Sequence, residues 1–106
     1  MIVVYSRNQV PIRLGQERWG HILRRHPQMA NQKGRVLETL SDPDLIQEGD
    51  LDTLLAIRFY GKSPLMRKDP VIGCREVDRT DGFVLRAYYT SAPSKMRVIL
   101  WKRSKS

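Results

Sequence analysis

Two histidines lie close together in an arginine-rich segment. His21 and His26 are the only histidines of the 106 residues, and Arg18 and Arg25 flank the first of them. At about 100° per residue of an α-helix, Arg18, His21 and Arg25 fall on one narrow arc. Histidine moves protons at neutral pH, and guanidinium groups bind phosphate through paired hydrogen bonds. The arc is therefore suited to acid–base chemistry beside a bound phosphate, with His21 as the proton carrier.

His26 falls on the opposite arc of the same helix, with Trp19 and Ile22. A histidine at a helix end interacts favourably with the helix dipole, which gives His26 a structural role. The same side chain can also serve as an acid or base. The sequence leaves open which histidine is the catalytic acid or base.

Alternation along the later segments predicts which side chains face the core, because successive side chains of a strand point to opposite faces of a sheet. The apolar sets expected to face the core are Leu55, Ile57, Phe59, Ile72, Cys74, Phe83, Leu85, Ala87 and Tyr89. The polar residues expected to share the other, open face are Arg58, Tyr60, Arg75, Arg86, Tyr88 and Thr90. Arginines that bind phosphate and rings that stack on unpaired bases suit RNA. The alternative interpretation is an ordinary solvated sheet face.

These residue types are sufficient for one way of cutting RNA. Attack by the 2′-hydroxyl needs a base, an acid for the leaving 5′ oxygen, and cations for the charge on phosphorus. Histidine and arginine supply all three, and the sequence lacks the Cys and His spacing that holds zinc. We expect a reaction without metal or other cofactor that leaves a 2′,3′-cyclic phosphate. Glu76 is a further candidate base.

The elements that position these residues are predicted to be helical first and extended later. A strand at 2–5 precedes a helix at 15–26, which ends there because a residue before proline avoids the helical region. Asn31 is the expected N-cap of a second helix that ends by Asp42-Pro43. The extended segments that follow are 45–48, 53–60, 71–78, 83–90 and 97–101.

Asp81-Gly82 lies between two of these segments and is typical of a tight hairpin turn. We therefore expect an α+β fold with two N-terminal helices packed on one face of an antiparallel sheet. Residues 1–106 fit a single domain with a short basic tail from about Lys102.

The net charge of +8 favours a polyanionic partner, with nucleic acid first. Lys62 adds to this charge in a basic loop at 61–70. Apolar runs such as Leu54–Ile57 are far shorter than the roughly 20 residues of a membrane span. The apolar start, Met1–Tyr5, lacks the flanks of a secretory signal. We expect a cytoplasmic protein that does not enter the membrane.

The segment Arg18–Pro27, R-W-G-H-I-L-R-R-H-P, together with Leu40–Asp44 and Asp81–Tyr88, resembles the phage-associated barnase/EndoU/colicin/RelE-like nucleases. Members of that family have an R-x-x-H-I-x-x-R-H-P helix, an L-x-x-P-D helix exit and a D-G-x-x-x-x-A-Y strand. The resemblance covers roughly residues 18–91.

The resemblance implies a barnase/RelE-like fold and an RNA-cutting domain of toxin-like or phage origin. It makes His21, Arg25 and His26 the conspicuous polar residues of the helix, with Tyr88 on the late strand. Many members carry threonine before the Ala-Tyr pair, where this chain has Arg86.

The combined interpretation is an endoribonuclease with His21 as acid or base and Arg25, Arg58 and Arg86 as phosphate-binding cations. A non-catalytic RNA- or DNA-binding module is the alternative, because it needs the same arginines without proton transfer. A third interpretation is a toxin-like subunit whose basic face is covered by an acidic antitoxin or inhibitor protein.

Overall fold

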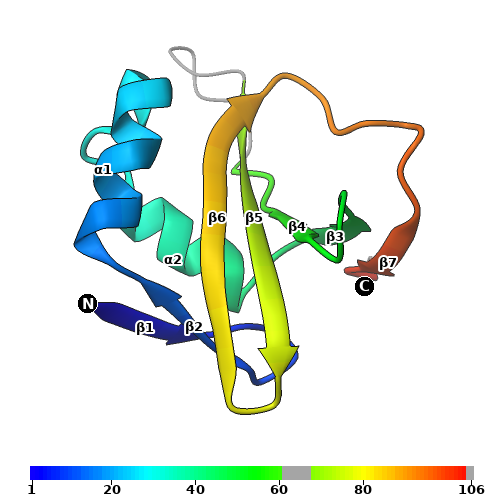
Figure 1. Cartoon of the computed structure of the whole chain (residues 1–106). Helices are drawn as coiled ribbons and strands as arrows, with labels where there is room; N and C mark the ends of the chain where they lie inside the picture. The colour runs from blue at the N-terminus through cyan, green and yellow to red at the C-terminus, as the bar shows by residue number, and fades with distance from the viewer. Residues whose placement is uncertain (61–67, 105–106) are drawn as a thin grey trace.

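The computed structural model describes residues 1–60 and 68–104, and in this part of the chain it is an α+β fold with a mixed, mostly antiparallel sheet (Figure 1). The strands are β1 (Ile2–Tyr5), β2 (Pro11–Leu14), β3 (Leu45–Glu48), β4 (Leu54–Ile57), β5 (Asp69–Asp78), β6 (Asp81–Thr90) and β7 (Ile99–Lys102). The helices are α1 (Gln16–Arg25), the short 3-10 helix η1 (Pro27–Met29) and α2 (Lys33–Ser41). The strand order is β1-β2-β6-β5-β4-β3-β7. The α+β class is confirmed.

An N-terminal hairpin extends the sheet beyond β6. β1 and β2 are antiparallel, and β2 runs parallel to the start of β6, with Ile12 opposite Gly82 and Arg13 opposite Phe83. The expected sheet was purely antiparallel and lacked Pro11–Leu14, so both expectations are wrong at this edge. A four-residue strand that begins with proline carries little strand signal, since proline cannot donate to the ladder.

The two helices begin and end near the predicted positions. α1 ends where the His26 backbone N–H donates to the Ile22 carbonyl at 2.8 Å, directly before Pro27. Gln32, and not Asn31, is the N-cap of α2, and no side chain caps that helix. Asn31 has φ of 65° and makes the turn before it, a conformation that asparagine tolerates better than most residues.

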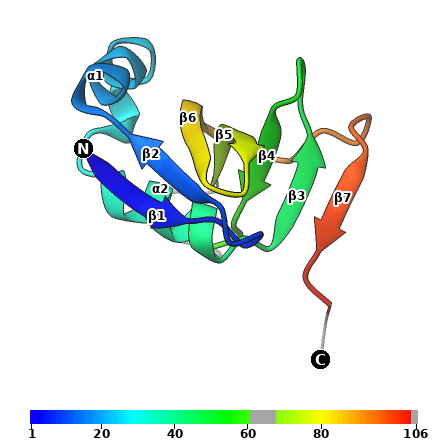
Figure 2. The ribbon, with the colours of Figure 1, turned by 60° about the horizontal axis from the view of Figure 1, so that its bottom comes forward.

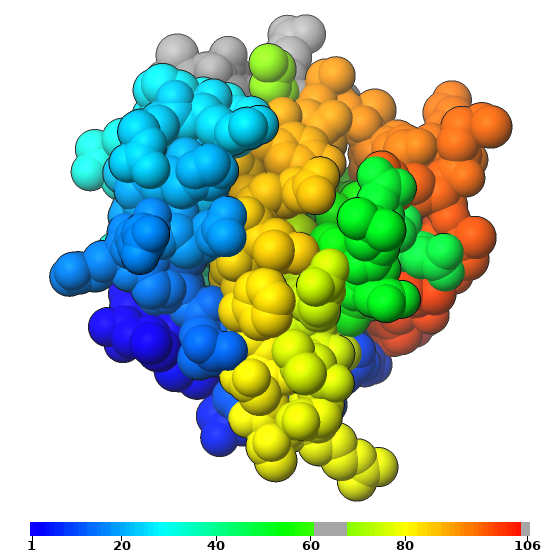
Figure 3. All heavy atoms as spheres, in the orientation of Figure 1, coloured from blue at the N-terminus to red at the C-terminus, as the bar shows by residue number. Residues whose placement is uncertain are grey.

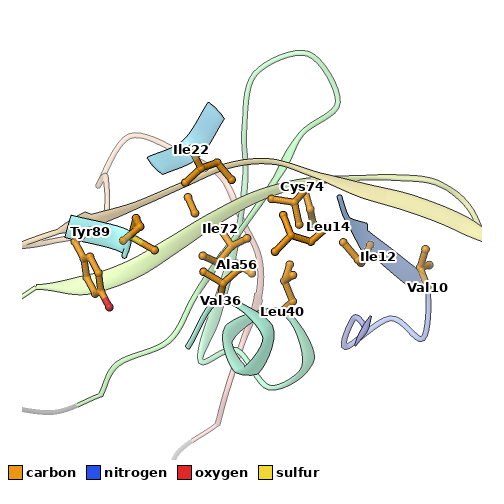
Figure 4. Packing of buried hydrophobic residues seen from close by; sticks show 13 residues of the cluster. Val10, Ile12, Leu14, Ile22, Val36, Leu40, Ala56, Ile72, Cys74 and Tyr89 are labelled. Atoms are coloured by element: carbon orange, nitrogen blue, oxygen red, sulfur yellow. The ribbon is translucent and has the colours of Figure 1, made fainter. Parts of the chain in front are cut away.

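One hydrophobic core lies between α2 and the sheet (Figure 4). Ile22 from α1 and Val36 and Leu40 from α2 join it, and all three are 2% exposed or less. Ile72 and Cys74 of β5 face this core, as predicted. Burying each such side chain contributes about 1.5–3 kcal/mol, which fixes α1 and α2 on the sheet.

The other face of the sheet is also apolar in its middle. A second buried cluster contains Leu45, Leu55, Ile57 and Val71, with Tyr88 packed against it. Residues 91–97 cross this face, where the Gln47 amide donates to the Ser94 carbonyl at 2.8 Å.

The prediction of which β4 side chains face the helices is therefore wrong. Ala56 faces the helix-side core, whereas Leu55 and Ile57 face the second cluster. Phe59, also expected in the core, is 45% exposed. A continuous apolar run such as 54–57 is buried on both faces, so its alternation carries no information about the side of the helices.

β6 contains a β-bulge at Leu85. Arg86 pairs with Gly73 while Val84 pairs with Cys74, so Leu85 has no partner on β5. The bulge reverses the alternation, because two residues of one strand then oppose one of the other. Ala87 and Tyr89 face the core as predicted, but Val84 replaces Phe83 and Leu85 there. Arg86 is exposed, in agreement with the prediction, while Leu85 is only half-buried.

The C-terminal strand β7 pairs with β3 at the edge of the sheet (Figure 2). The Arg103 guanidinium binds the carboxylates of Asp42 and Asp44 and the Pro43 carbonyl. These contacts tie the end of the chain to the loop between α2 and β3. In the described part of the chain, no helix combines the length and apolarity needed to cross a bilayer.

Candidate active site

Helix α1 lies beside the second half of β6 (Figure 1). β2 pairs with β6 only at Gly82 and Phe83, so the later residues of β6 have α1, and not another strand, at that edge. The Arg18 Nη1 atom donates to the Leu85 carbonyl at 3.3 Å, which joins the helix to the bulge. The bulge carbonyl thus holds one of the predicted arginines in place.

A groove runs between α1 and β6, on the side of the molecule seen in Figure 3, where the blue and cyan atoms of α1 adjoin the gold atoms of β6. Its first cavity has a volume of about 570 Å³. The lining residues are Arg18, His21, Ile22, Arg25, His26, Leu85, Arg86, Ala87 and Tyr88. Six polar or aromatic residues that the sequence singled out therefore meet in one cavity.

Both histidines reach this cavity, although they were predicted on opposite arcs of the helix. The His26 and Tyr88 rings are tilted by 36° with centroids 6.0 Å apart. His26 leaves the helical conformation, with φ of −135°, and this carries its side chain out of the apolar arc. The backbone of His26 ends α1, and its ring lines the groove. His26 can therefore serve both as the end of the helix and as a residue of the site.

A second cavity of about 520 Å³ continues the groove toward the N-terminus of α1. The two cavities share Arg18 and His21. The remaining lining residues of the second cavity are Met1, Arg13, Gly15, Glu17, Arg24, Phe83 and Val84. His21 and Arg18 therefore lie at the middle of one continuous groove.

Several arginines that line the groove form no ion pair in the described part of the chain. Within residues 1–60 and 68–104, no ion pair involves Arg18, Arg24, Arg25 or Arg86. Among the described residues, the arginines that form ion pairs are Arg13, Arg58, Arg97 and Arg103. Unpaired guanidinium groups along a groove attract an anion most strongly there.

Arg58 and Tyr60 do not share the surface of Arg86, so that prediction is wrong. The Arg58 Nη1 atom donates to the Asp42 carboxylate at 2.9 Å and to its carbonyl at 2.6 Å. The Tyr60 hydroxyl donates to the Glu38 carboxylate at 2.5 Å. Burial, and then this hydrogen bond, raise the pKa of Tyr60 to about 12. Both side chains face α2. Alternation places them on the same face as Ala56, which points toward the helices, and not on the face of Leu55 and Ile57.

The other predicted binding residues lie outside the two cavities. Arg75 is on the same face as Arg86 but donates to the Leu51 carbonyl at 2.7 Å. The Thr90 hydroxyl donates to the Ala92 carbonyl at 2.8 Å, under the segment that crosses the sheet. Glu76 accepts hydrogen bonds from Ser6 and Asn8, away from the groove. Lys62 lies outside the described residues.

Sequence reasoning missed Arg13, Arg24 and Phe83 in the second cavity. Arg24 belongs to neither helical arc, and Phe83 was placed in the core. The positions of Arg13 and Phe83 depend on the parallel pairing of β2 with β6 and on the bulge, and no local pattern signals either feature.

In comparisons with protein-family models, with curated proteins and with solved structures, the chain matches none. The fold and site define an α+β protein with an arginine- and histidine-lined groove. Any functional conclusion therefore rests on the chemistry of this groove.

Proposed function

We propose that the chain is a metal-independent endoribonuclease whose active site is the groove between α1 and β6. The observation that carries the proposal is that His21, His26, Arg25 and Arg86 line one cavity together with Tyr88. Two proton carriers and several cations are the groups that cleavage by the 2′-hydroxyl needs, and the ring of Tyr88 can stack on an unpaired base.

In the proposed reaction one histidine, in its neutral form, accepts the proton of the 2′-hydroxyl. The 2′ oxygen attacks the adjacent phosphorus, and the bond from phosphorus to the 5′ oxygen breaks. The other histidine, in its charged form, gives its proton to that oxygen. The products are a 2′,3′-cyclic phosphate and a 5′-hydroxyl.

The arginines have a separate role in this proposal. Arg18, Arg25 and Arg86 bind the phosphate and offset the charge that grows on its oxygens in the transition state. Arg58, which the sequence predicts as a third phosphate-binding cation beside Arg25 and Arg86, is assigned instead to the ion pairs with Glu38 and Asp42. The site is thus smaller than the one expected from strand alternation.

The proposal includes a barnase/RelE-like origin of the fold and a cytoplasmic place of action. The order from α1 onward, with α2 followed by the antiparallel strands β3, β4, β5 and β6, supports the first part. An acidic inhibitor or antitoxin protein fits the same view, since the arginines of the groove would bind its carboxylates.

Incubation of the pure protein with single-stranded RNA in EDTA tests the proposal. We expect fragments that end in a 2′,3′-cyclic phosphate, identified by mass spectrometry. A substrate with 2′-deoxyribose at the cut position should stay intact, since it lacks the attacking hydroxyl. Tight RNA binding without cleavage would replace the enzyme by the non-catalytic RNA- or DNA-binding module.

A further inference from the structure

The second cavity contains an aromatic side chain that the proposed reaction does not use. Phe83 is half-buried in its wall, beyond the His21 and Arg18 side chains that both cavities share. Tyr88 lies at the corresponding place in the first cavity. The groove therefore has an aromatic ring on each side of its central histidine.

We infer that the groove takes single-stranded RNA across at least two unpaired nucleotides, with one base on Tyr88 and another on Phe83. The phosphate between them is then bound by Arg18 and lies beside His21. The inference rests on the proposed function and extends it by naming the substrate class and a second base-binding position.

The surroundings of Phe83 suit a stacked base. The Arg13 and Arg75 guanidinium carbons each lie 5.9 Å from the centroid of the Phe83 ring. Arg13 is itself fixed by Asp81, with Nε to Oδ1 at 2.8 Å. A ring flanked by fixed cations combines stacking with attraction for the sugar–phosphate chain, which is how proteins hold single strands.

The two rings are too far apart to hold the same base. Phe83 and Tyr88 are five residues apart on β6, which is about 16 Å along a strand and somewhat less across the bulge. A continuous chain that contacts both rings must therefore present separate bases. Bases paired in a duplex are stacked on their neighbours and cannot lie on either ring, so a duplex is a poor substrate.

The charges of the second cavity favour a phosphate at the end where it meets the first cavity, near Arg18 and His21. Arg24, exposed and without an ion pair in the described residues, lines it together with Arg18. Glu17, in the first turn of α1, is the acid among its lining residues. A phosphate is thereby repelled from Glu17 and drawn toward the arginines and His21.

The test uses 2′-O-methyl RNA oligonucleotides, which cannot be cleaved, with 2-aminopurine placed at successive positions. Stacking on an aromatic ring quenches 2-aminopurine fluorescence, so we expect quenching at two separate positions of the wild-type complex. Phe83→Leu should abolish quenching at one position only. It should weaken single-strand binding by about 5- to 150-fold, the loss of one stacked base.

Two variants and one measurement serve as controls. Phe59→Leu removes a ring that is 45% exposed and outside both cavities, so it should bind like wild type. Phe83→Tyr keeps a ring and should keep the quenching. Circular dichroism melting checks that each variant folds.

The outcomes separate this inference from the proposed activity. Unchanged quenching in Phe83→Leu, or equally tight binding of duplex RNA, overturns the two-base groove even if RNA is cleaved. Quenching at two positions, lost at one of them in Phe83→Leu, supports the groove even if natural RNA stays intact, a result that would overturn only the nuclease proposal.

Discussion

Gly73 on β5 makes room for the Arg86 side chain on the adjoining strand β6. The two residues are paired, and a Cβ atom added to Gly73 would lie 2.7 Å from Arg86 Cγ and 3.3 Å from Cδ. No real Cβ tolerates the first distance, so the arginine stem lies where a side chain at position 73 would be. The absence of a side chain on β5 thus sets the direction of a cation in the groove.

Gly73→Ala should displace Arg86 and weaken binding of single-stranded RNA by about tenfold. That factor corresponds to about 1.4 kcal/mol, close to the worth of one hydrogen bond to a charged group. Fluorescence anisotropy with a 2′-O-methyl oligonucleotide measures the change. In the Arg86→Ala background the same substitution should have no further effect on affinity, since the displaced group is already gone.

Gly34→Ala is the matched control. Gly34 is in α2, and nothing lies within 4 Å of its Cβ position. The substitution should leave RNA affinity unchanged and stabilise the helix by up to about 1 kcal/mol. If Gly73→Ala bound RNA as tightly as Gly34→Ala does, the proposed dependence of Arg86 on Gly73 would be wrong.

The helix motif predicted the groove better than the strand pattern did. Arg18, His21 and Arg25 follow a 3.6-residue period that no tertiary contact disturbs, and they line the groove as a group. On β6 the alternation was correct for Ala87 and Tyr89 and failed before the bulge at Leu85. A bulge depends on the pairing of two strands, so the sequence of one strand does not reveal it.

The errors at Arg58 and Tyr60 have a different cause. Both faces of β4 are buried, one by the helices and the other by residues 91–97. The apolar run in Leu54–Ile57 was assigned to the wrong core, and a strand in the opposite phase has every side chain on the other face. The ion pairs of Arg58 with Glu38 and Asp42 show that its side chain lies on the face of the sheet that α2 covers.

Loss of the Asp42 carboxylate should destabilise the protein at neutral pH and less so in acid. The hydrogen bond from Arg103, with a smaller contribution from Arg58, holds the pKa of Asp42 below its ordinary value of 3.8 although burial opposes this. The stabilisation is complete above the unfolded-state pKa and disappears as the pH falls through the lower folded-state pKa. Asp42→Asn should therefore lower Tm at pH 7, with a gap that narrows as the pH falls below the ordinary pKa of 3.8.

Asp52→Asn is the control for the acid series. Asp52 is exposed, has φ of 62°, which asparagine tolerates, and forms no ion pair within the described residues. Its Tm should follow the wild-type curve at every pH. A constant gap between Asp42→Asn and wild type across the acid range would contradict the ion-pair explanation.

Cys74 should be inert in the folded protein. It is 3% exposed, and burial, aided by the charge of Glu76, raises the pKa of its thiol to about 12. Because the thiolate is the nucleophile, a disulfide reagent at pH 8 should label the native protein far more slowly than the protein in urea. Ser104→Cys, at an exposed position, should add one thiol that reacts at once. Rapid loss of both thiols without unfolding would refute the burial of Cys74.

Binding of single-stranded RNA should fall linearly with salt on a log–log plot. Each phosphate contact to a single strand contributes about 0.7 to the slope. Arg25→Gln should reduce the slope by about that amount, because Arg25 lines the groove without a carboxylate partner in the described residues. Arg79→Gln, in the turn between β5 and β6, should leave the slope unchanged. Equal slopes for both variants would argue against phosphate binding in the groove.

The last prediction separates the roles of the two histidines, which the structure places in one cavity. His21→Ala and His26→Ala should each slow cleavage by about 10²- to 10⁴-fold with little loss of affinity for the 2′-O-methyl oligonucleotide. A substrate with sulfur in place of the bridging 5′ oxygen has a leaving group that needs no proton. It should restore cleavage in the variant that lacks the acid and leave the variant that lacks the base slow. Melting curves must show that both variants are folded, since the His26 backbone ends α1. Wild-type activity in either variant would remove that histidine from the mechanism, and rescue of both by the sulfur substrate would show that neither is the base.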